Sequence, residues 1–415
     1  MKKITMSAVA LTAIMGSFSS VSAADGINIL SDVKLDAQIR PRYEMVDDGN
    51  DATENASAVT ARTKLKVSGN LLDVDGLNAS VGIISVNNFG YHEYNWNTSN
   101  YTTDDGKRYS VVMDPQKAIL SNAEVTYKTG DTLLHAGRGQ VNLDNQRFIG
   151  TVGWRQLERS YDTVFVANNS IKNLSVLAAW VYGFQGVVDA PTADTNSVLL
   201  NASYTISDAL KITAYDYMLA SIHDTYGIAL TGKVKLDSVK LDYRAEYAMQ
   251  SDATMEIHDA EANADAEYYN LDLGANISGI LAGVNYEFLS GTDGVDGKTA
   301  FTTPLATLHK FNGWADQFLG TPSGGLVDMN VRLGYKAKGF GKLLAVYHDF
   351  TTDVEMAGQD DLGSEIDVLY ANKVPGVNGL SGLLKFASYS GGTVAGHTND
   401  VSKFWAQLDY KFSTK

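Results

Sequence analysis

Apolar and polar side chains alternate with a period of two near the start of this chain, and the same pattern recurs along its whole length. The odd positions from 33 to 45 are Val33, Leu35, Ala37, Ile39, Pro41, Tyr43 and Met45, and the even positions are Lys34, Asp36, Gln38, Arg40, Arg42 and Glu44. A strand with one apolar and one charged face needs lipid or a protein core on one side and water on the other. The pattern therefore favours an all-β fold, a transmembrane antiparallel barrel around a wet lumen.

The first residues have the form of a secretory signal peptide. Lys2 and Lys3 precede an apolar stretch, and the run from Val21 to Ala23 has the small-x-small form of a cleavage site. The apolar stretch is much shorter than the ~20 residues that a membrane-spanning helix needs. We therefore expect residues 1–23 to be a signal peptide and residues 24–415 to form one barrel domain in the outer membrane of a Gram-negative cell. Its strands should run from about Val33 to Phe412, with residues 24–32 outside the barrel.

The composition narrows the possible functions. Cysteine is absent, which excludes disulfides, thiol catalysis and cysteine metal sites. The chain has 22 Tyr, 5 Trp and 14 Phe, enough for two interfacial aromatic girdles, and only 6 Pro. The net charge of −15 argues against a nucleic-acid partner.

The spacing of the strand-like runs supports the barrel more strongly than any single run. We expect about 18 strands. Alternate gaps are short and turn-like: 73–76, 130–131, 207–209, 237–238, 278–279 and 338–341. Most of the other gaps are long: 47–58, 88–117, 143–160, 251–265 and 291–325, with 220–223 as a short exception. Short periplasmic turns on one rim and long extracellular loops on the other are typical of outer-membrane barrels.

The polar faces of the strands are expected to line the lumen. In Val239–Gln250 one face is apolar and the other carries Lys240, Asp242, Arg244 and Glu246. Charges facing lipid would cost about 2–4 kcal/mol each at the midplane. A barrel of this size is wide enough for an aqueous channel.

Basic residues are the leading candidates for pore lining and solute binding: Arg40, Arg42, Arg62, Lys64, Arg138, Arg147, Arg155, Arg159, Arg244 and Arg332. A positive field in a narrow wet pore concentrates anions. The alternative is that these bases pair with luminal acids in a rigid ladder. Both interpretations remain open from the sequence.

Two segments are denser in Arg, Trp and amide residues than strand periodicity explains. The first contains Gly137–Gln140, Arg147–Gly150, Trp154–Gln156 and Arg159–Asp162, and the second runs from His309 to Gly320. Here the chain resembles the alginate-export family of outer-membrane porins. The resemblance implies an 18-stranded monomeric barrel with an electropositive lumen.

The arginine-rich segment suggests a constriction. Arg147, Arg155 and Arg159 lie in a long loop that can fold into the barrel, and guanidinium forks suit carboxylates. Trp154 is the candidate apolar anchor of this loop. Trp314 and Asp316, in the second segment, are read as a lid or a structural latch.

These observations predict a porin that passes small hydrophilic solutes, with a preference for small anionic solutes or acidic sugars, and has outer-membrane lipid around it. One alternative is a dedicated exporter of an alginate-like acidic polysaccharide, which would need periplasmic partners. Another is a surface adhesin or structural barrel. We expect no enzyme, cofactor or metal site, because no His pair has metal-ligand spacing and His348-Asp349 is a weak hydrolase signal.

Overall fold

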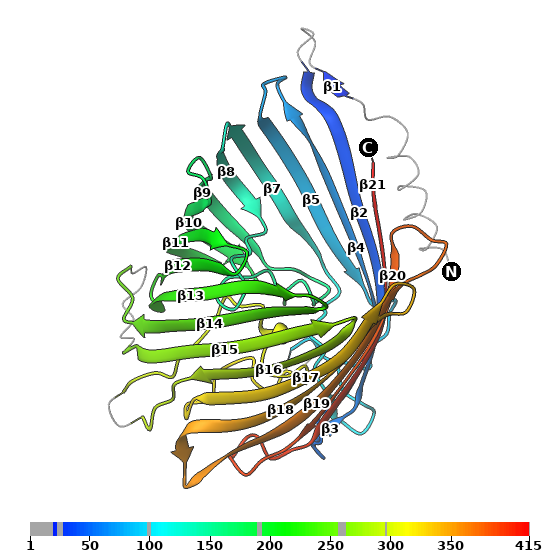
Figure 1. Ribbon diagram of the computed structural model, residues 1–415. Helices are drawn as coiled ribbons and strands as arrows, with labels where there is room; N and C mark the ends of the chain where they lie inside the picture. The colour runs from blue at the N-terminus through cyan, green and yellow to red at the C-terminus, as the bar shows by residue number, and fades with distance from the viewer. Residues whose placement is uncertain are drawn as a thin grey trace.

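The computed structural model describes residues 20–22, 28–97, 101–188, 193–255, 263–294 and 297–414. In this part of the chain 18 strands form a closed antiparallel barrel, as predicted (Figure 1). They are β2 (Asn28–Asp47), β4 (Ala56–Leu71), β5 (Leu77–Asn87), β7 (Ala118–Thr129), β8 (Thr132–Gly139), β9 (Ser160–Asn168), β10 (Leu174–Gln185), β11 (Ala193–Ser207), β12 (Leu210–Leu219), β13 (His223–Leu236), β14 (Val239–Ser251), β15 (Asp265–Ile277), β16 (Ile280–Leu289), β17 (Leu326–Ala337), β18 (Gly341–Met356), β19 (Gln359–Lys373), β20 (Leu380–Ser390) and β21 (Val401–Ser413).

The barrel closes between its first and last strands. β2 pairs with β4 on one side and with β21 on the other, where Asp36 lies opposite Ser413. All the barrel pairings are antiparallel, and all except β2–β21 join barrel strands that follow one another in the chain. Two short strands outside the barrel, β3 (Thr53–Glu54) and β6 (Arg108–Tyr109), pair in parallel, and the 3-10 helix η1 spans Leu308–Lys310.

The start of the barrel differs from the prediction. Residues 24–32 were expected outside it, but Asn28–Asp32 belongs to β2, and Leu30 pairs with Leu71. Asp32 has a φ of 51°, and the register shifts between Ser31 and Lys34, which interrupts the alternation that the sequence pattern depends on. The short strand β1 (Ser20–Ser22) pairs with β2. The predicted cleavage site after Ala23 lies outside the described residues, so the signal peptide stays a prediction.

Loop lengths follow the expected parity. Two-residue turns at 130–131, 208–209, 237–238 and 278–279 lie at one rim, where Asp237 and Gly279 adopt the positive φ that tight hairpins require. Long loops at 88–117, 140–159, 252–264 and 290–325 belong to the other rim. The loop at 220–222 is short, as anticipated. Between β18 and β19 the connection is a short turn at 357–358, so Asp360 and Asp361 lie in β19.

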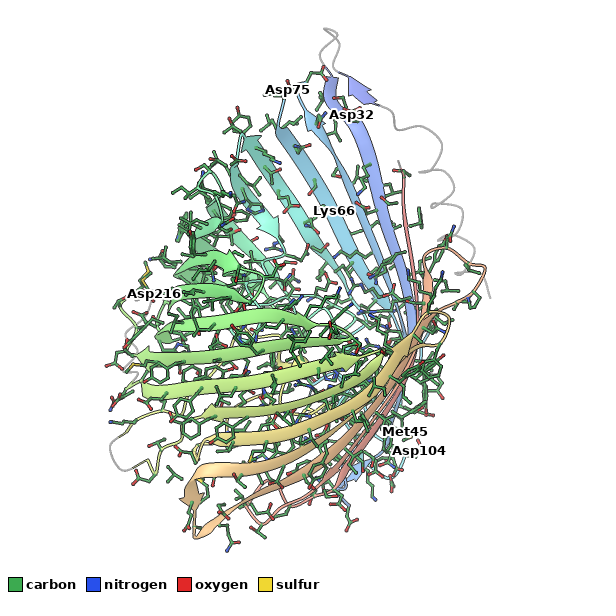
Figure 2. All side chains as sticks on the ribbon, viewed as in Figure 1. Asp32, Met45, Lys66, Asp75, Asp104 and Asp216 are labelled. Carbon is green, nitrogen blue, oxygen red and sulfur yellow. The ribbon has the colours of Figure 1, made fainter. Side chains whose placement is uncertain are left out.

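The two faces of the strands differ as lipid and water require. Outward side chains such as Leu271, Val331 and Leu333 are 58%, 53% and 64% exposed, and this apolar belt fits contact with lipid. Side chains project from both faces of the wall, and Lys66 lies on the inner one (Figure 2). Among the described residues no helix has the length and hydrophobicity to cross a membrane.

The apolar core lies inside the barrel. The largest buried cluster joins inward residues of the strands, such as Tyr215, Tyr268 and Trp405, to loop residues Phe148 and Phe301. Phe148 alone packs its ring within 6.3 Å of four other aromatic rings. The long loops therefore fold into the barrel, where they pack against the inward side chains of the strands.

Candidate functional site: a luminal constriction

Two long loops meet inside the barrel. We call residues 140–159, between β8 and β9, the arginine loop, and residues 290–325, between β16 and β17, the tryptophan loop. Gly150 N–H donates to the Leu305 carbonyl at 2.8 Å, and Thr307 N–H donates to the Gln146 carbonyl at 3.0 Å. A Cβ at Gly150 would lie 2.2 Å from Thr307 Oγ1, so glycine is required for this close approach.

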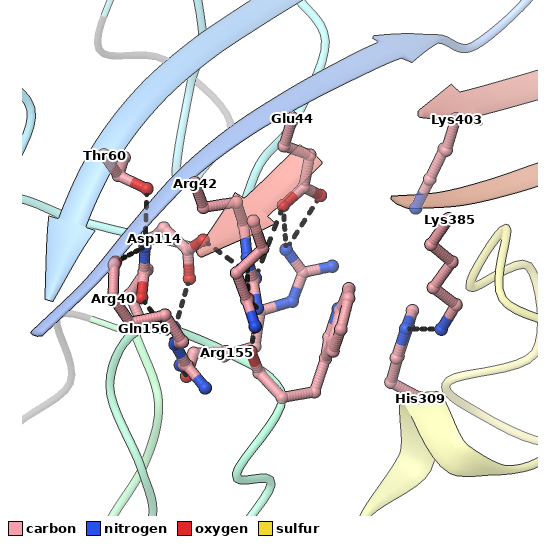
Figure 3. Close-up of polar contacts among 12 residues, drawn as sticks. Arg40, Arg42, Glu44, Thr60, Asp114, Arg155, Gln156, His309, Lys385 and Lys403 are labelled. Carbon is pink, nitrogen blue, oxygen red and sulfur yellow. Dashed lines mark hydrogen bonds and ion pairs between the residues drawn. The ribbon is translucent and has the colours of Figure 1, made fainter. Parts of the chain in front are cut away.

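The arginine loop docks on the inner face of β2 through backbone carbonyls (Figure 3). Arg40 Nη1 donates to the Gly153 carbonyl at 2.9 Å, and Arg42 donates to the Trp154 carbonyl. The Arg42 guanidinium also lies 4.1 Å from the centre of the Trp154 ring. Gln156 reaches back to Thr60 Oγ1 at 2.9 Å. Arg40 and Arg42 therefore hold the loop and are themselves buried, at 5% and 2% exposure.

Arg155 links three segments. Its Nη1 donates to Glu44 of β2 at 3.0 and 3.2 Å, and its Nη2 donates to Asp316 of the tryptophan loop at 2.8 Å. Burial by itself lowers the pKa of Arg155, but the carboxylates of Glu44 and Asp316 outweigh burial and raise the pKa. The guanidinium therefore stays charged although it is buried, and both of its Nη atoms already donate to carboxylates.

Glu158 makes the corresponding connection to β4. It pairs with Arg62 and, at 2.6 Å, with the Lys64 ammonium. Burial raises the pKa of Glu158, yet these two cations prevail and lower the pKa overall.

Two further arginines of the arginine loop, Arg147 and Arg159, contact other partners. Arg147 Nε donates to Glu287 of β16 at 2.7 Å, and the same guanidinium reaches Thr303 and Asn312 at 3.0 Å each. Arg159 is buried and donates to the Pro304 carbonyl at 3.1 Å. Neither guanidinium is aimed at open space in this arrangement.

A lysine that sequence reasoning did not single out lies between the two loops. Lys385 of β20 has its ammonium 4.3 Å from the centre of the Trp154 ring and 3.8 Å from that of Trp314. The ammonium also contacts His309 Nε2 at 2.6 Å, and His309 Nδ1 contacts Asp316 at 2.6 Å. Burial lowers the pKa of His309 far below its usual range, so a neutral ring accepts from Lys385 and donates to Asp316.

The other predicted basic residues lie on the barrel wall, away from this junction. Arg138 pairs with Asp162 at 2.6 Å, Arg244 with Glu246 at 2.8 Å, and Arg332 with Asp272. The structure thus brings together Arg40, Arg42, Arg62, Lys64, Trp154, Arg155, Trp314 and Asp316. Arg244 also contacts the arginine loop through an ion pair with Asp144, whereas Arg138 and Arg332 lie apart. His348 faces inward and pairs with Asp328 at 2.8 Å, whereas Asp349 lies on the opposite face, so these neighbours form no hydrolase pair.

A polar pocket of about 540 Å³, which we call the basic pocket, lies in the lumen beneath the arginine loop. Its charged lining consists of Arg40, Arg62, Lys64, Lys66 and Lys411 with Asp36, Glu158 and Asp409. Lys64, Lys66 and Lys411 keep 21%, 30% and 66% of their side chains exposed. The pocket therefore combines an excess of basic groups with ammonium groups that a solute can reach.

Comparison with known proteins supports the fold. No protein-family model matches this chain, and no curated protein matches it. Several solved structures, in contrast, are similar to this chain in fold. The crystal structure of Acinetobacter baumannii OccAB2 is 14% identical over 93% of this chain and 99% of its own, with a TM-score of 0.71.

Two structures from Pseudomonas aeruginosa are equally similar. OccK9 (OpdG) is 15% identical over 93% of this chain and 100% of its own, with a TM-score of 0.72. OpdK, solved with vanillate, is 15% identical over the same shares, with a TM-score of 0.71. This chain shares the 18-stranded fold of the Occ structures. It is a barrel of the Gram-negative outer-membrane type, as predicted. The resemblance to the alginate-export family rests on sequence motifs alone.

Proposed function

We propose that this chain is an outer-membrane channel that passes small hydrophilic solutes and favours those bearing a carboxylate. The observation that carries the proposal is the basic pocket, where five basic side chains face three acidic ones in the lumen beneath the constriction. A net positive field inside a low-dielectric wall concentrates anions.

The exposed ammonium groups suit transient binding. Lys66 contacts Glu124 at 2.7 Å and Lys64 contacts Glu158 at 2.6 Å, so each shares its charge with a fixed partner. A solute carboxylate would compete for part of that charge, and a charge-assisted hydrogen bond contributes about 1.5–3 kcal/mol before this competition. Weak binding at several positions allows entry and release, which conduction requires.

A similar fold with a carboxylate ligand gives the proposal outside support. The OpdK structure holds vanillate, which carries a carboxylate. For this chain the export of a long acidic polysaccharide is less well supported, because a polymer would have to displace the buried contacts of Arg155 and Glu158 that hold the two loops in the lumen.

Swelling of proteoliposomes tests the proposal with matched solutes. Succinate and succinamide have similar size, but only succinate is anionic. We expect faster uptake of succinate, and we expect Lys66→Gln with Lys411→Gln to reduce that preference. Lys298→Gln, which removes a cation outside the basic pocket, is the matched control. Equal uptake of both solutes by the wild-type protein would contradict carboxylate preference, and no uptake of either would favour a structural barrel or adhesin.

A further inference from the structure

A second luminal pocket, of about 340 Å³, lies against a different part of the wall. Inward side chains of β14 to β18 form its wall, including Arg244 of β14, and Lys310, Phe311 and Trp314 of the tryptophan loop also line it. Its volume is at the lower end of the range for small-molecule sites. We call it the amide pocket, because three of its wall residues are Asn270, Asn285 and Asn330.

Strand register places the polar groups in one row. Asp272 lies opposite Asn285, Asn285 opposite Asn330, and Asn330 opposite His348 across four neighbouring strands. Residues opposite one another on the same face are close enough to act on one ligand. The row therefore offers a ladder of hydrogen-bonding groups along one side of the pocket.

Most of the charged side chains in this pocket already have ion-pair partners. Arg332 makes a two-pronged contact with Asp272, in which Nη2 donates to Oδ1 at 3.0 Å. Gly283 makes this possible, because a Cβ there would lie 2.6 Å from Arg332 Nη2. His348 contacts Asp328 at 2.8 Å, and Arg147 contacts Glu287 at 2.7 Å. The lining holds as many Lys and Arg side chains (Arg244, Lys310 and Arg332) as carboxylates (Asp272, Glu287 and Asp328), whereas the basic pocket has an excess of cations.

The amides supply the remaining hydrogen-bonding capacity. Asn270 donates to the Asn285 carbonyl oxygen at 3.1 Å, and Asn330 Nδ2 lies 3.3 Å from Asp328 Oδ1. Within the described part of the chain, two side-chain amide groups have no hydrogen-bond partner: the Asn285 NH₂ group (Nδ2) and the Asn330 side-chain oxygen (Oδ1). A hydroxyl both donates and accepts, and can serve both groups, whereas a carboxylate can only accept.

We propose that the amide pocket binds a neutral, polyhydroxylated ring solute of the hexose class. Its hydroxyls would bond to Asn285 and Asn330, and the less polar surface of the ring would contact Phe311 and Trp314, whose aromatic rings supply apolar area. The assignment goes beyond the carboxylate preference of the basic pocket. The lumen then holds two sites of different charge, and each selects its own solute class.

Equilibrium binding to the full-length protein in detergent tests this, with intrinsic tryptophan fluorescence as the readout because Trp314 lines the pocket. The probes are methyl glucoside, which is neutral, and succinate, which has carboxylates and no hydroxyl. In Asn285→Ala/Asn330→Ala we expect methyl glucoside to bind roughly fivefold or more weakly, as the loss of one or two hydrogen bonds predicts. Succinate binding should be unchanged. Asn201→Ala, an amide on β11 outside this pocket, is the matched control.

The possible outcomes separate the two proposals. If wild-type protein binds succinate but not methyl glucoside, the amide-pocket assignment is wrong and the proposed function stands. Equal weakening of both probes would also contradict it, because it would indicate a shared site or a disturbed lumen. Should the double variant fail to fold, the single changes Asn285→Ser and Asn330→Ser, which retain a polar group, replace it. Unchanged methyl glucoside affinity in both single variants would overturn the assignment.

Discussion

Arg155 donates two hydrogen bonds to Glu44, at 3.0 and 3.2 Å, and thereby joins the arginine loop to the first barrel strand. Both side chains are buried, at 4% and 1% exposure. The same guanidinium contacts Asp316, so one residue fixes the position of both luminal loops relative to the wall. The position of the two loops in the lumen therefore depends on buried ion pairs, which water screens little.

The first prediction concerns this pair. Arg155→Met should lower the free energy of unfolding by up to about 3–5 kcal/mol, because it removes a hydrogen-bonded cation from two buried carboxylates. Glu44 would keep only Arg42 at 3.7 Å, and Asp316 would keep Lys403 at 3.2 Å and the neutral His309. Lys298→Met breaks the exposed pair with Asp265 and should cost about 0–1 kcal/mol. Chemical denaturation in detergent micelles measures both. Equal effects of the two variants would show that the Arg155 contacts do not hold the lumen together.

The second prediction concerns Lys385 and the tryptophan rings. Trp314→Leu removes a ring 3.8 Å from the Lys385 ammonium, an interaction worth about 2 kcal/mol where water is excluded. We expect the tryptophan loop to become accessible to protease, while Trp180→Leu on the outer face leaves it protected. An unchanged cleavage pattern in Trp314→Leu would mean that the loop is held by its other contacts.

The third prediction concerns the close approach of the two loops. Gly150→Ala would place a Cβ 2.2 Å from Thr307 Oγ1, and the strain should cost about 1–3 kcal/mol of unfolding free energy. Gly186 has open space around its Cβ position, so Gly186→Ala is the control and should change stability little. Thermal unfolding followed by circular dichroism compares them. If both variants melt with the wild type, the loops do not approach as closely as described.

The fourth prediction is a pH dependence. The pKa of His309 is lowered in the fold by burial, so near pH 6.5 the unfolded chain takes up a proton that the folded chain does not. The contribution of His309 to the free energy of unfolding is therefore fully present above about pH 6.5. As the pH falls towards the lower pKa of the folded state, the free energy of unfolding decreases by up to about 1.4 kcal/mol per pH unit. His309→Gln should flatten this slope between pH 7 and 5. An equal slope in both proteins would exclude His309 as the titrating group.

The barrel was predictable because its determinants are local. Lipid outside and water inside impose a period of two on every strand, and Val331 and Asp328 of β17 show the two faces that result. Short and long loops alternate along the chain because successive connections lie at opposite rims of the barrel. At Asp32 a positive φ and a register shift interrupt the alternation, and there the predicted start of the barrel was wrong.

The interior was not predictable to the same degree, because it depends on how distant loops dock. The sequence marks Arg155 and Trp154 as unusual for a loop, but it does not reveal that Arg155 would meet Glu44, 111 residues away. Lys385 looks like any luminal charge on a strand. Its place between two tryptophans arises only when both loops fold inward.

The reversal potential across a planar bilayer in a salt gradient tests the central claim most directly. The net positive charge of the basic pocket predicts anion selectivity for the wild-type channel, which should decrease in Lys64→Gln/Lys66→Gln/Lys411→Gln. The effect should shrink as salt shortens the Debye length below about 8 Å. A cation-selective wild-type channel, or a reversal potential that the triple variant leaves unchanged, would contradict the proposal that the basic pocket selects the solute.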